Sequence, residues 1–175
     1  MCGPWEEKGF IDRHIDQQLV EEARATRVQR LNLGEKAVKV LNDRNAMAQA
    51  RTHAALTIGQ LGYTPGIPVL VEQITLKNPT GREGESDVGL LWPCVRALAD
   101  LSVAAVPVLA EAYANETQKE RRELIQYAIV FGKAYSEAKT YTQGLLSQTK
   151  GPAQRKALEE LLKLIPENEK VETRE

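Results

Sequence analysis

The chain has 175 residues, which is enough for one domain with a hydrophobic core or for one short array of repeats. Its 23 lysines and arginines nearly balance its 24 aspartates and glutamates. Overall charge therefore provides no attraction for nucleic acid or for anionic membranes.

The N-terminal region predicts an irregular lead-in followed by a pair of helices. Residues 1–10 mix glycine, proline and charged side chains. Apolar residues then recur every four positions from Ile11 to Ala23, as on one face of a helix. Asn32-Leu33-Gly34 is expected to end this helix, and residues 35–41 are expected to form a second, short one.

The second helical pair is predicted at residues 46–61 and 68–76, with a turn at 62–66. Pro68 fits the opening turn of its helix, where the missing N–H would have no partner in any case. Residues 77–87 are polar and rich in glycine, so they predict a loop. A tolerated surface insertion is the simpler interpretation of this loop, and a contact element is the alternative.

Three further predicted segments complete the domain. The third pair is expected at residues 90–101 and 106–114, and the fourth at 119–135 and 137–148, with Ser136 as an N-cap. A last helix over 153–165 is apolar on one side and charged on the other, as a capping element must be. The charged composition of residues 166–175 predicts a disordered tail.

An internal repeat links the second and third pairs. The segment Ile67-Pro68-Val69-Leu70-Val71-Glu72 aligns with Val106-Pro107-Val108-Leu109-Ala110-Glu111, 39 positions further on. A period of about 40 residues is typical of stacked helical pairs. We therefore expect an all-α fold, a right-handed alpha-alpha superhelix of about four helix pairs plus a C-terminal capping helix, over residues 11–165.

The second pair resembles the HEAT repeat, in particular the bacterial type called the PBS-lyase HEAT-like repeat. The residues that carry the resemblance are Arg51, Ala54, Ala55, Leu56, Ile58, Gly59, Leu61, Gly62, Ile67, Pro68 and Leu70. The third pair matches more loosely, through Ala97, Leu98, Ala99, Leu101, Val106, Pro107 and Leu109. Tyr63 stands where such repeats usually carry an aspartate. The resemblance implies an armadillo-like alpha-solenoid that binds other macromolecules, without implying any particular partner.

The sequence contains no recognisable catalytic or metal-binding set. His14 and His53 lack a second ligand at metal spacing. Cys94 aligns with Ala54 of the preceding pair, which favours a buried thiol over a nucleophile. We therefore expect no enzyme activity, no metal and no cofactor.

The residues expected to contact a partner are Trp92, Glu72, Gln73, Glu111 and Gln143. The last four would lie on the inner face of the solenoid, together with Lys39 and Thr142. Glu72 and Glu111 occupy equivalent positions, so simple exposure on the return helices is the alternative interpretation. Trp92 follows the 77–87 loop and would either anchor a partner or seal the core between repeats.

The expected function is a non-enzymatic protein–protein interaction scaffold or adaptor that binds a protein or peptide through this inner face. One alternative is a nucleic-acid-binding protein resembling the HEAT-like DNA glycosylases, but nearby glutamates match the arginines of this chain. Another alternative is a protein resembling a bilin lyase or chaperone. Self-association stays open.

The expected compartment follows from the cysteines and from hydropathy. Two cysteines that lie far apart suggest no disulfide framework, which favours a reducing, cytoplasmic location. The sequence shows no run of about 18 apolar residues, so we expect no membrane-spanning helix. If Cys2 follows a removed signal peptide, the protein would instead be lipid-anchored or exported.

Overall fold

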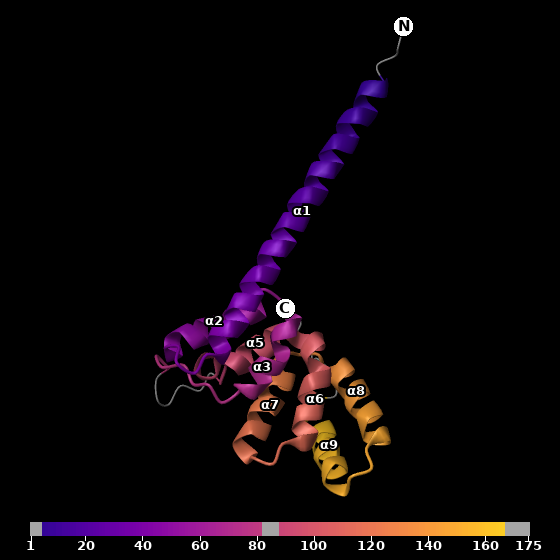
Figure 1. Ribbon diagram of the computed structural model, residues 1–175. Helices are drawn as coiled ribbons and strands as arrows, with labels where there is room; N and C mark the ends of the chain where they lie inside the picture. Colours follow the sequence, from indigo (N-terminus) through magenta and orange to yellow (C-terminus); the bar gives the residue numbers. More distant parts are fainter. Residues whose placement is uncertain (1–4, 82–87, 167–175) are drawn as a thin grey trace, which may run out of the picture. The chain divides into compact units, whose positions relative to one another are not determined.

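The computed structural model describes residues 5–81 and 88–166, and the side chains from residue 24 onward within them. All secondary structure in these ranges is helical, which confirms the predicted all-α class (Figure 1). The chain separates into two units, residues 1–33 and 34–175. The predicted tail beyond residue 166 and the loop residues 82–87 lie outside the described ranges.

The first unit consists of most of α1, which spans Trp5–Asn42 and extends into the second unit. The irregular lead-in predicted for residues 1–10 is therefore wrong from Trp5 onward, and the predicted first pair is a single helix. Gly34 does not break it, because one glycine costs a helix only about 1 kcal/mol. A Cβ at Gly34 would lie 2.4 Å from two ring carbons of Tyr63, so this glycine serves close packing instead.

The second unit begins with two helices joined by a tight turn. Helix α2 spans Ala48–Gln60, the 3₁₀ turn η1 spans Thr64–Gly66, and α3 spans Ile67–Glu72. The predicted turn at 62–66 is confirmed, and Gly62 takes a positive φ of 63° that suits glycine. Helix α3 ends four residues earlier than predicted.

The middle of the unit repeats this local plan. Helix α4 spans Val88–Leu91, α5 spans Pro93–Leu101, the 3₁₀ turn η2 spans Ser102–Ala105, and α6 spans Val106–Asn115. Both α3 and α6 follow a 3₁₀ turn and carry proline in their first turn. The sequence repeat therefore corresponds to a repeated local structure.

Three helices complete the described chain. Helix α7 spans Lys119–Phe131, α8 spans Tyr135–Gln148, and α9 spans Pro152–Leu164. Ser136 was predicted as an N-cap but lies inside the first turn of α8, whose N-cap is Ala134. Proline is again in the first turn of α9, where its missing N–H has no cost.

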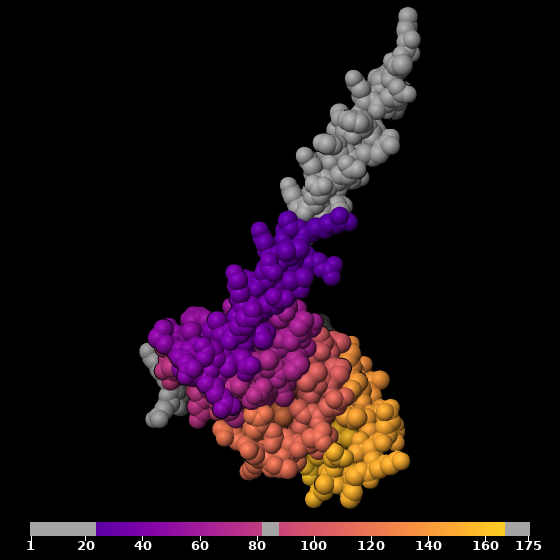
Figure 2. All heavy atoms as spheres, in the orientation of Figure 1, coloured from indigo at the N-terminus to yellow at the C-terminus, as the bar shows by residue number. Residues whose placement is uncertain are grey.

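The helices of the second unit pack in two series. Helix α2 packs on α5 and α5 on α7, while α3 packs on α6 and α6 on α8. Helix α9 packs against both α6 and α8 (Figure 1). Their buried side chains form one hydrophobic core, and side chains fill the spaces that the ribbons leave (Figure 2). The fully buried members of this core include Ile58, Leu70, Leu98, Leu109 and Ile125.

One segment, Pro93–Asn115, is long and apolar enough to cross a membrane by length and composition alone. It comprises α5, η2 and α6, and 56% of its most apolar window is buried inside the protein. Ser102, with φ 45° and ψ −121°, interrupts the α-helical backbone in its middle. Its apolar composition is accounted for by its place in the core.

Candidate functional site

Gln73, one of the predicted contact residues, is held in an intramolecular network. Its Oε1 accepts a 2.6 Å hydrogen bond from Nη2 of Arg51. The Nε of the same arginine donates to the backbone carbonyl of Leu41 at 3.1 Å. Arg51 thus links the end of α1 to the residue that follows α3, and Gln73 has a structural role there.

Glu72 exposes its side chain, but its backbone belongs to a second arginine network. Arg121 donates from Nη1 to the carbonyl of Glu72 and from Nη2 to that of Val71, both at 3.1 Å. Its Nε donates to Oε2 of Glu116 at 2.7 Å. A cation at the carbonyl end of α3 is favourable for the helix dipole. The backbone N–H of Gln118, which donates to Oε1 of Glu116 at 3.0 Å, and then the hydrogen bond from Arg121 hold the pKa of Glu116 below its usual value.

Glu111 and Gln143 lie on α6 and α8, and both are exposed. Oε1 of Glu111 accepts a 2.9 Å hydrogen bond from the hydroxyl of Tyr141 on α8. This bond and the nearby negative charge raise the pKa of Tyr141. Lys39 is exposed as expected, but Thr142 is fully buried, so the prediction that it lies on an exposed face is wrong. Side chains in a helix alternate between core and solvent on a 3.6-residue period, and Thr142 falls on the core side.

Trp92 lies in the core and is only 8% exposed. The Nζ of Lys77 lies 4.9 Å from the centre of its ring, a cation–π contact on the ring face. The burial of this indole in the core favours the interpretation as a seal between helices over that as an anchor for a partner. The 77–87 loop begins at the residue that covers this ring.

Cys94 and His53, the two side chains weighed for catalytic or metal chemistry, lie in different environments. Cys94 is fully buried, and desolvation raises the pKa of its thiol to about 12, which keeps it protonated and unreactive. His53 is exposed on α2. Within the described residues, no group of three or more His, Cys, Asp or Glu side chains could hold a metal ion.

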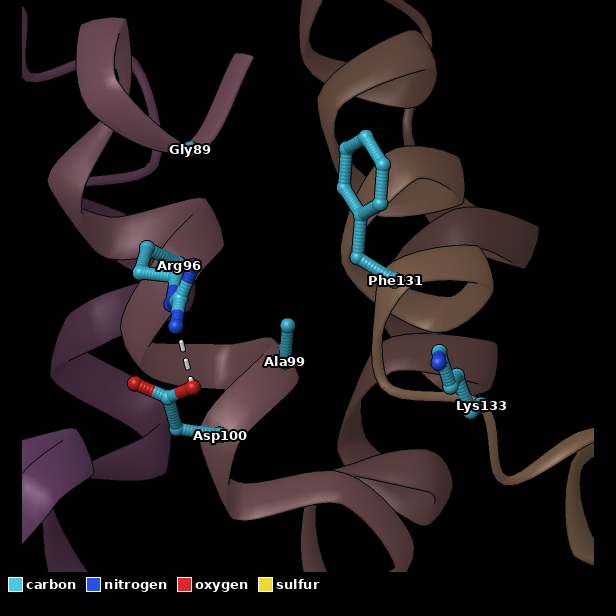
Figure 3. A pocket seen from close by; sticks show the side chains of 6 residues that line it. All are labelled: Gly89, Arg96, Ala99, Asp100, Phe131 and Lys133. Carbon is cyan, nitrogen blue, oxygen red and sulfur yellow. Dashed lines mark hydrogen bonds and ion pairs between the residues drawn. The ribbon is translucent and has the colours of Figure 1, made fainter. Parts of the chain in front are cut away.

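The structure reveals a cavity that sequence reasoning missed. Its volume is about 380 Å³, and Figure 3 shows it between α4 and α5 on one side and the end of α7 on the other. The lining residues are Gly89, Arg96, Ala99, Asp100, Phe131 and Lys133. Arg96 and Asp100, four residues apart on α5, pair through Nε and Oδ1 at 3.1 Å.

Two large aromatic side chains mark this region: one lines the cavity, and the other stacks on the first. Phe131, which lines it, is 48% exposed, and Tyr127, one helical turn earlier, is 42% exposed. Their rings stack with centroids 5.9 Å apart and an interplanar angle of 15°. The buried side chains of α7 are Leu124, Ile125, Ala128 and Ile129. Apolar residues on more sides of α7 than the core requires are the sequence signal that could have indicated this surface.

The backbone at the edge of the cavity adopts unusual conformations. In the described residues, Ser102 at φ 45° and Lys133 at φ 54° are the non-glycine residues with positive φ. The hydroxyl of Ser102 donates a 2.8 Å hydrogen bond to the carbonyl of Gly132, next to Lys133. Such conformations cost about 1–3 kcal/mol each and occur preferentially at functional sites.

A second cavity, of about 460 Å³, lies between α8 and α9. Its lining residues are Lys139, Glu159, Leu162, Lys163 and Ile165. It lacks exposed aromatic residues and strained backbone, so the cavity beside Phe131 is the stronger candidate.

No family model, no curated protein and no solved structure matches this chain. The geometry of these surfaces is therefore the basis for a functional assignment.

Proposed function

We propose that this chain is a non-enzymatic binding module for a protein or peptide, built as a HEAT-like alpha-solenoid. Two observations support the architecture. Helices α2, α5 and α7 pack in one series, and α3, α6 and α8 pack in another, so equivalent helices of successive pairs contact one another. The repeated succession of a 3₁₀ turn and a helix with proline in its first turn also suits a repeat protein.

In this proposal the solenoid has three helical pairs, α2 with α3, α5 with α6, and α7 with α8. The last turns of α1 would cover the first pair, since Ala37 and Leu41 belong to the core. Helix α9 would close the other end against α6 and α8. The number of pairs falls from the four predicted to three because the segment expected to form the first pair is the single helix α1.

The exposed aromatic pair Tyr127–Phe131 beside the cavity is the observation that carries the binding function. Large aromatic side chains are enriched at the centres of protein interfaces, because they bury much area at low entropic cost. The cavity lies within the range of about 300–1,000 Å³ that is typical of ligand sites. We therefore favour this face over the α3–α6–α8 face expected from the sequence, whose glutamate and glutamine side chains carry no apolar anchor.

The arginine contacts favour a protein partner over a nucleic acid. Arg51, Arg121, Arg122 and Arg155 all donate hydrogen bonds to backbone carbonyls within the chain. Guanidinium groups held in this way are not available to contact a row of phosphates. If the protein binds duplex DNA with an affinity that falls steeply as ionic strength rises, this view is contradicted.

Site-specific photocrosslinking in cells tests the proposal and distinguishes the two faces. A photoreactive phenylalanine analogue replaces Phe131 at the cavity or Gln143 on α8, and crosslinked proteins are identified by mass spectrometry. We expect one discrete partner crosslinked at position 131 and none at position 143. Crosslinking at position 143 alone would transfer the function to the α3–α6–α8 face. The absence of a crosslinked protein at either position would refute the binding function.

A further inference from the structure

We infer that the cavity between α5 and the end of α7 binds an extended segment of a partner protein in which a bulky apolar side chain lies next to an aspartate or glutamate. This inference rests on the proposed function and adds the chemistry of the partner. It depends on three properties of the cavity: its apolar wall, its excess of positive charge, and its fixed backbone.

The apolar wall provides a place for a large side chain. Phe131 lines one side, and Ala99 and Gly89 on the opposite side contribute little bulk of their own (Figure 3). A side chain inserted here would contact Phe131, a residue that is 48% exposed in the free protein. Stacking of Tyr127 against Phe131 restricts that ring before binding, so less conformational entropy is lost on association.

The charged part of the cavity favours one negative charge. Arg96 is paired with Asp100 at 3.1 Å, whereas Lys133 makes no ion pair within the part of the chain that the structure describes. The three side chains sum to a single positive charge, which one carboxylate neutralises. A phosphate group carries between about 1.5 and 2 negative charges, so a site with a single positive charge would leave part of the phosphate charge unneutralised. The balance therefore favours a carboxylate over a phosphorylated residue.

The backbone fixes the point from which the Lys133 side chain extends. Lys133 has a positive φ, and the preceding residue, Gly132, accepts the hydrogen bond from Ser102. The end of α7 is thereby tied to the end of α5, which brings the apolar wall and the cation to the same opening. A site whose groups are already in place needs little rearrangement to bind.

Peptide binding to the purified full chain tests the inference. The probes are fluorescein-labelled 12-residue peptides of glycine and serine that contain one tryptophan followed by one glutamate. Matched peptides replace the tryptophan with alanine, the glutamate with glutamine, or the glutamate with phosphoserine. Fluorescence anisotropy gives each Kd. We expect the alanine peptide to bind at least about tenfold more weakly and the glutamine peptide about three- to fivefold more weakly.

Variants of the protein locate the binding site. Phe131→Ala should weaken the tryptophan–glutamate peptide by about tenfold. Lys133→Gly should remove the preference for glutamate over glutamine, and it should fold because glycine suits a positive φ. Lys133→Arg keeps the charge and should preserve that preference. Gln143→Ala, on α8, is the control and should leave every Kd unchanged, and thermal unfolding of each variant verifies its fold.

Several results would overturn the inference. One is peptide binding that Phe131→Ala and Lys133→Gly leave unchanged; another is tighter binding of the phosphoserine peptide. Crosslinking at position 131 to a second copy of this chain, or to a protein segment without the apolar–acidic pair, would also refute it. In those crosslinking outcomes the module still binds a protein, so the proposed function survives. Failure to crosslink at either face is the separate result that removes the function itself.

Discussion

The contact between Gly59 and Ala97 provides a sharp test of how α2 and α5 pack. Replacing glycine with alanine inside a helix normally stabilises it by up to about 1 kcal/mol. At Gly59, however, an added Cβ would lie 2.7 Å from the Cα of Ala97 and 3.1 Å from its Cβ. The nearest atom belongs to the backbone, so a helix must shift. Overpacking of this kind costs about 1–3 kcal/mol.

We therefore expect Gly59→Ala to lower the free energy of unfolding by about 1–2 kcal/mol, after the gain in helix propensity is subtracted. Gly144 in α8 is the matched control. A Cβ there meets no atom within 4 Å, so Gly144→Ala should raise the free energy of unfolding by about 0.5–1 kcal/mol. Urea denaturation followed by circular dichroism at 222 nm measures both changes, because helix content dominates that signal.

A double variant separates the two close contacts. Adding Ala97→Gly to Gly59→Ala removes the contact with the Cβ but leaves the one with the Cα. We expect only partial recovery, of less than about 1 kcal/mol once the cost of a new glycine is included. If Gly59→Ala proves as stable as Gly144→Ala, α2 and α5 do not approach as closely as the structure indicates.

Three other measurements address separate features. Arg121→Ala should lower the free energy of unfolding by about 2 kcal/mol. The substitution leaves two carbonyls at the end of α3 and the Glu116 carboxylate without this donor. A variant as stable as the wild type in urea would contradict this. Glu116 has a lowered pKa in the folded state, so the stability that it contributes is present above its unfolded value of 4.5 and is lost as pH falls through the folded pKa. The stability difference between the wild type and Glu116→Gln should therefore shrink on acidification below about pH 4.5, and a constant difference would refute the linkage. The thiol of Cys94 should resist iodoacetamide at pH 8 in the native protein and react in urea, as peptide mapping that separates it from Cys2 can show; rapid native labelling would contradict its burial.

The local features of the fold were predictable from the sequence. Apolar spacing and proline at helix starts predicted helices close to α2, α3 and α5 to α9, since both signals act within a few residues. The single helix predicted over residues 90–101 is divided in the structure into α4 and α5. The turn at residues 62–66 and the burial of Cys94 were also predicted correctly. The repeat at Pro68 and Pro107 indicated equivalent local structures, which both helices show.

The continuity of α1 could not be read from its own residues. Asn32-Leu33-Gly34 has the composition of a helix end, and the structure nevertheless carries the helix through it. The ring of Tyr63, 29 residues further along the chain, occupies the space where a side chain at Gly34 would lie. A glycine selected for close packing and a glycine selected for a turn look the same in sequence.

The sequence by itself determined that this protein is helical, where most of its helices begin, and which two segments repeat, because those properties depend on neighbouring residues. Only the tertiary structure decided that Trp92 is buried, that Gln73 and Glu111 bond to other helices, and that Phe131 and Lys133 share a cavity with Arg96. These outcomes depend on which helices pack together, and that choice is made by contacts between residues far apart in the chain.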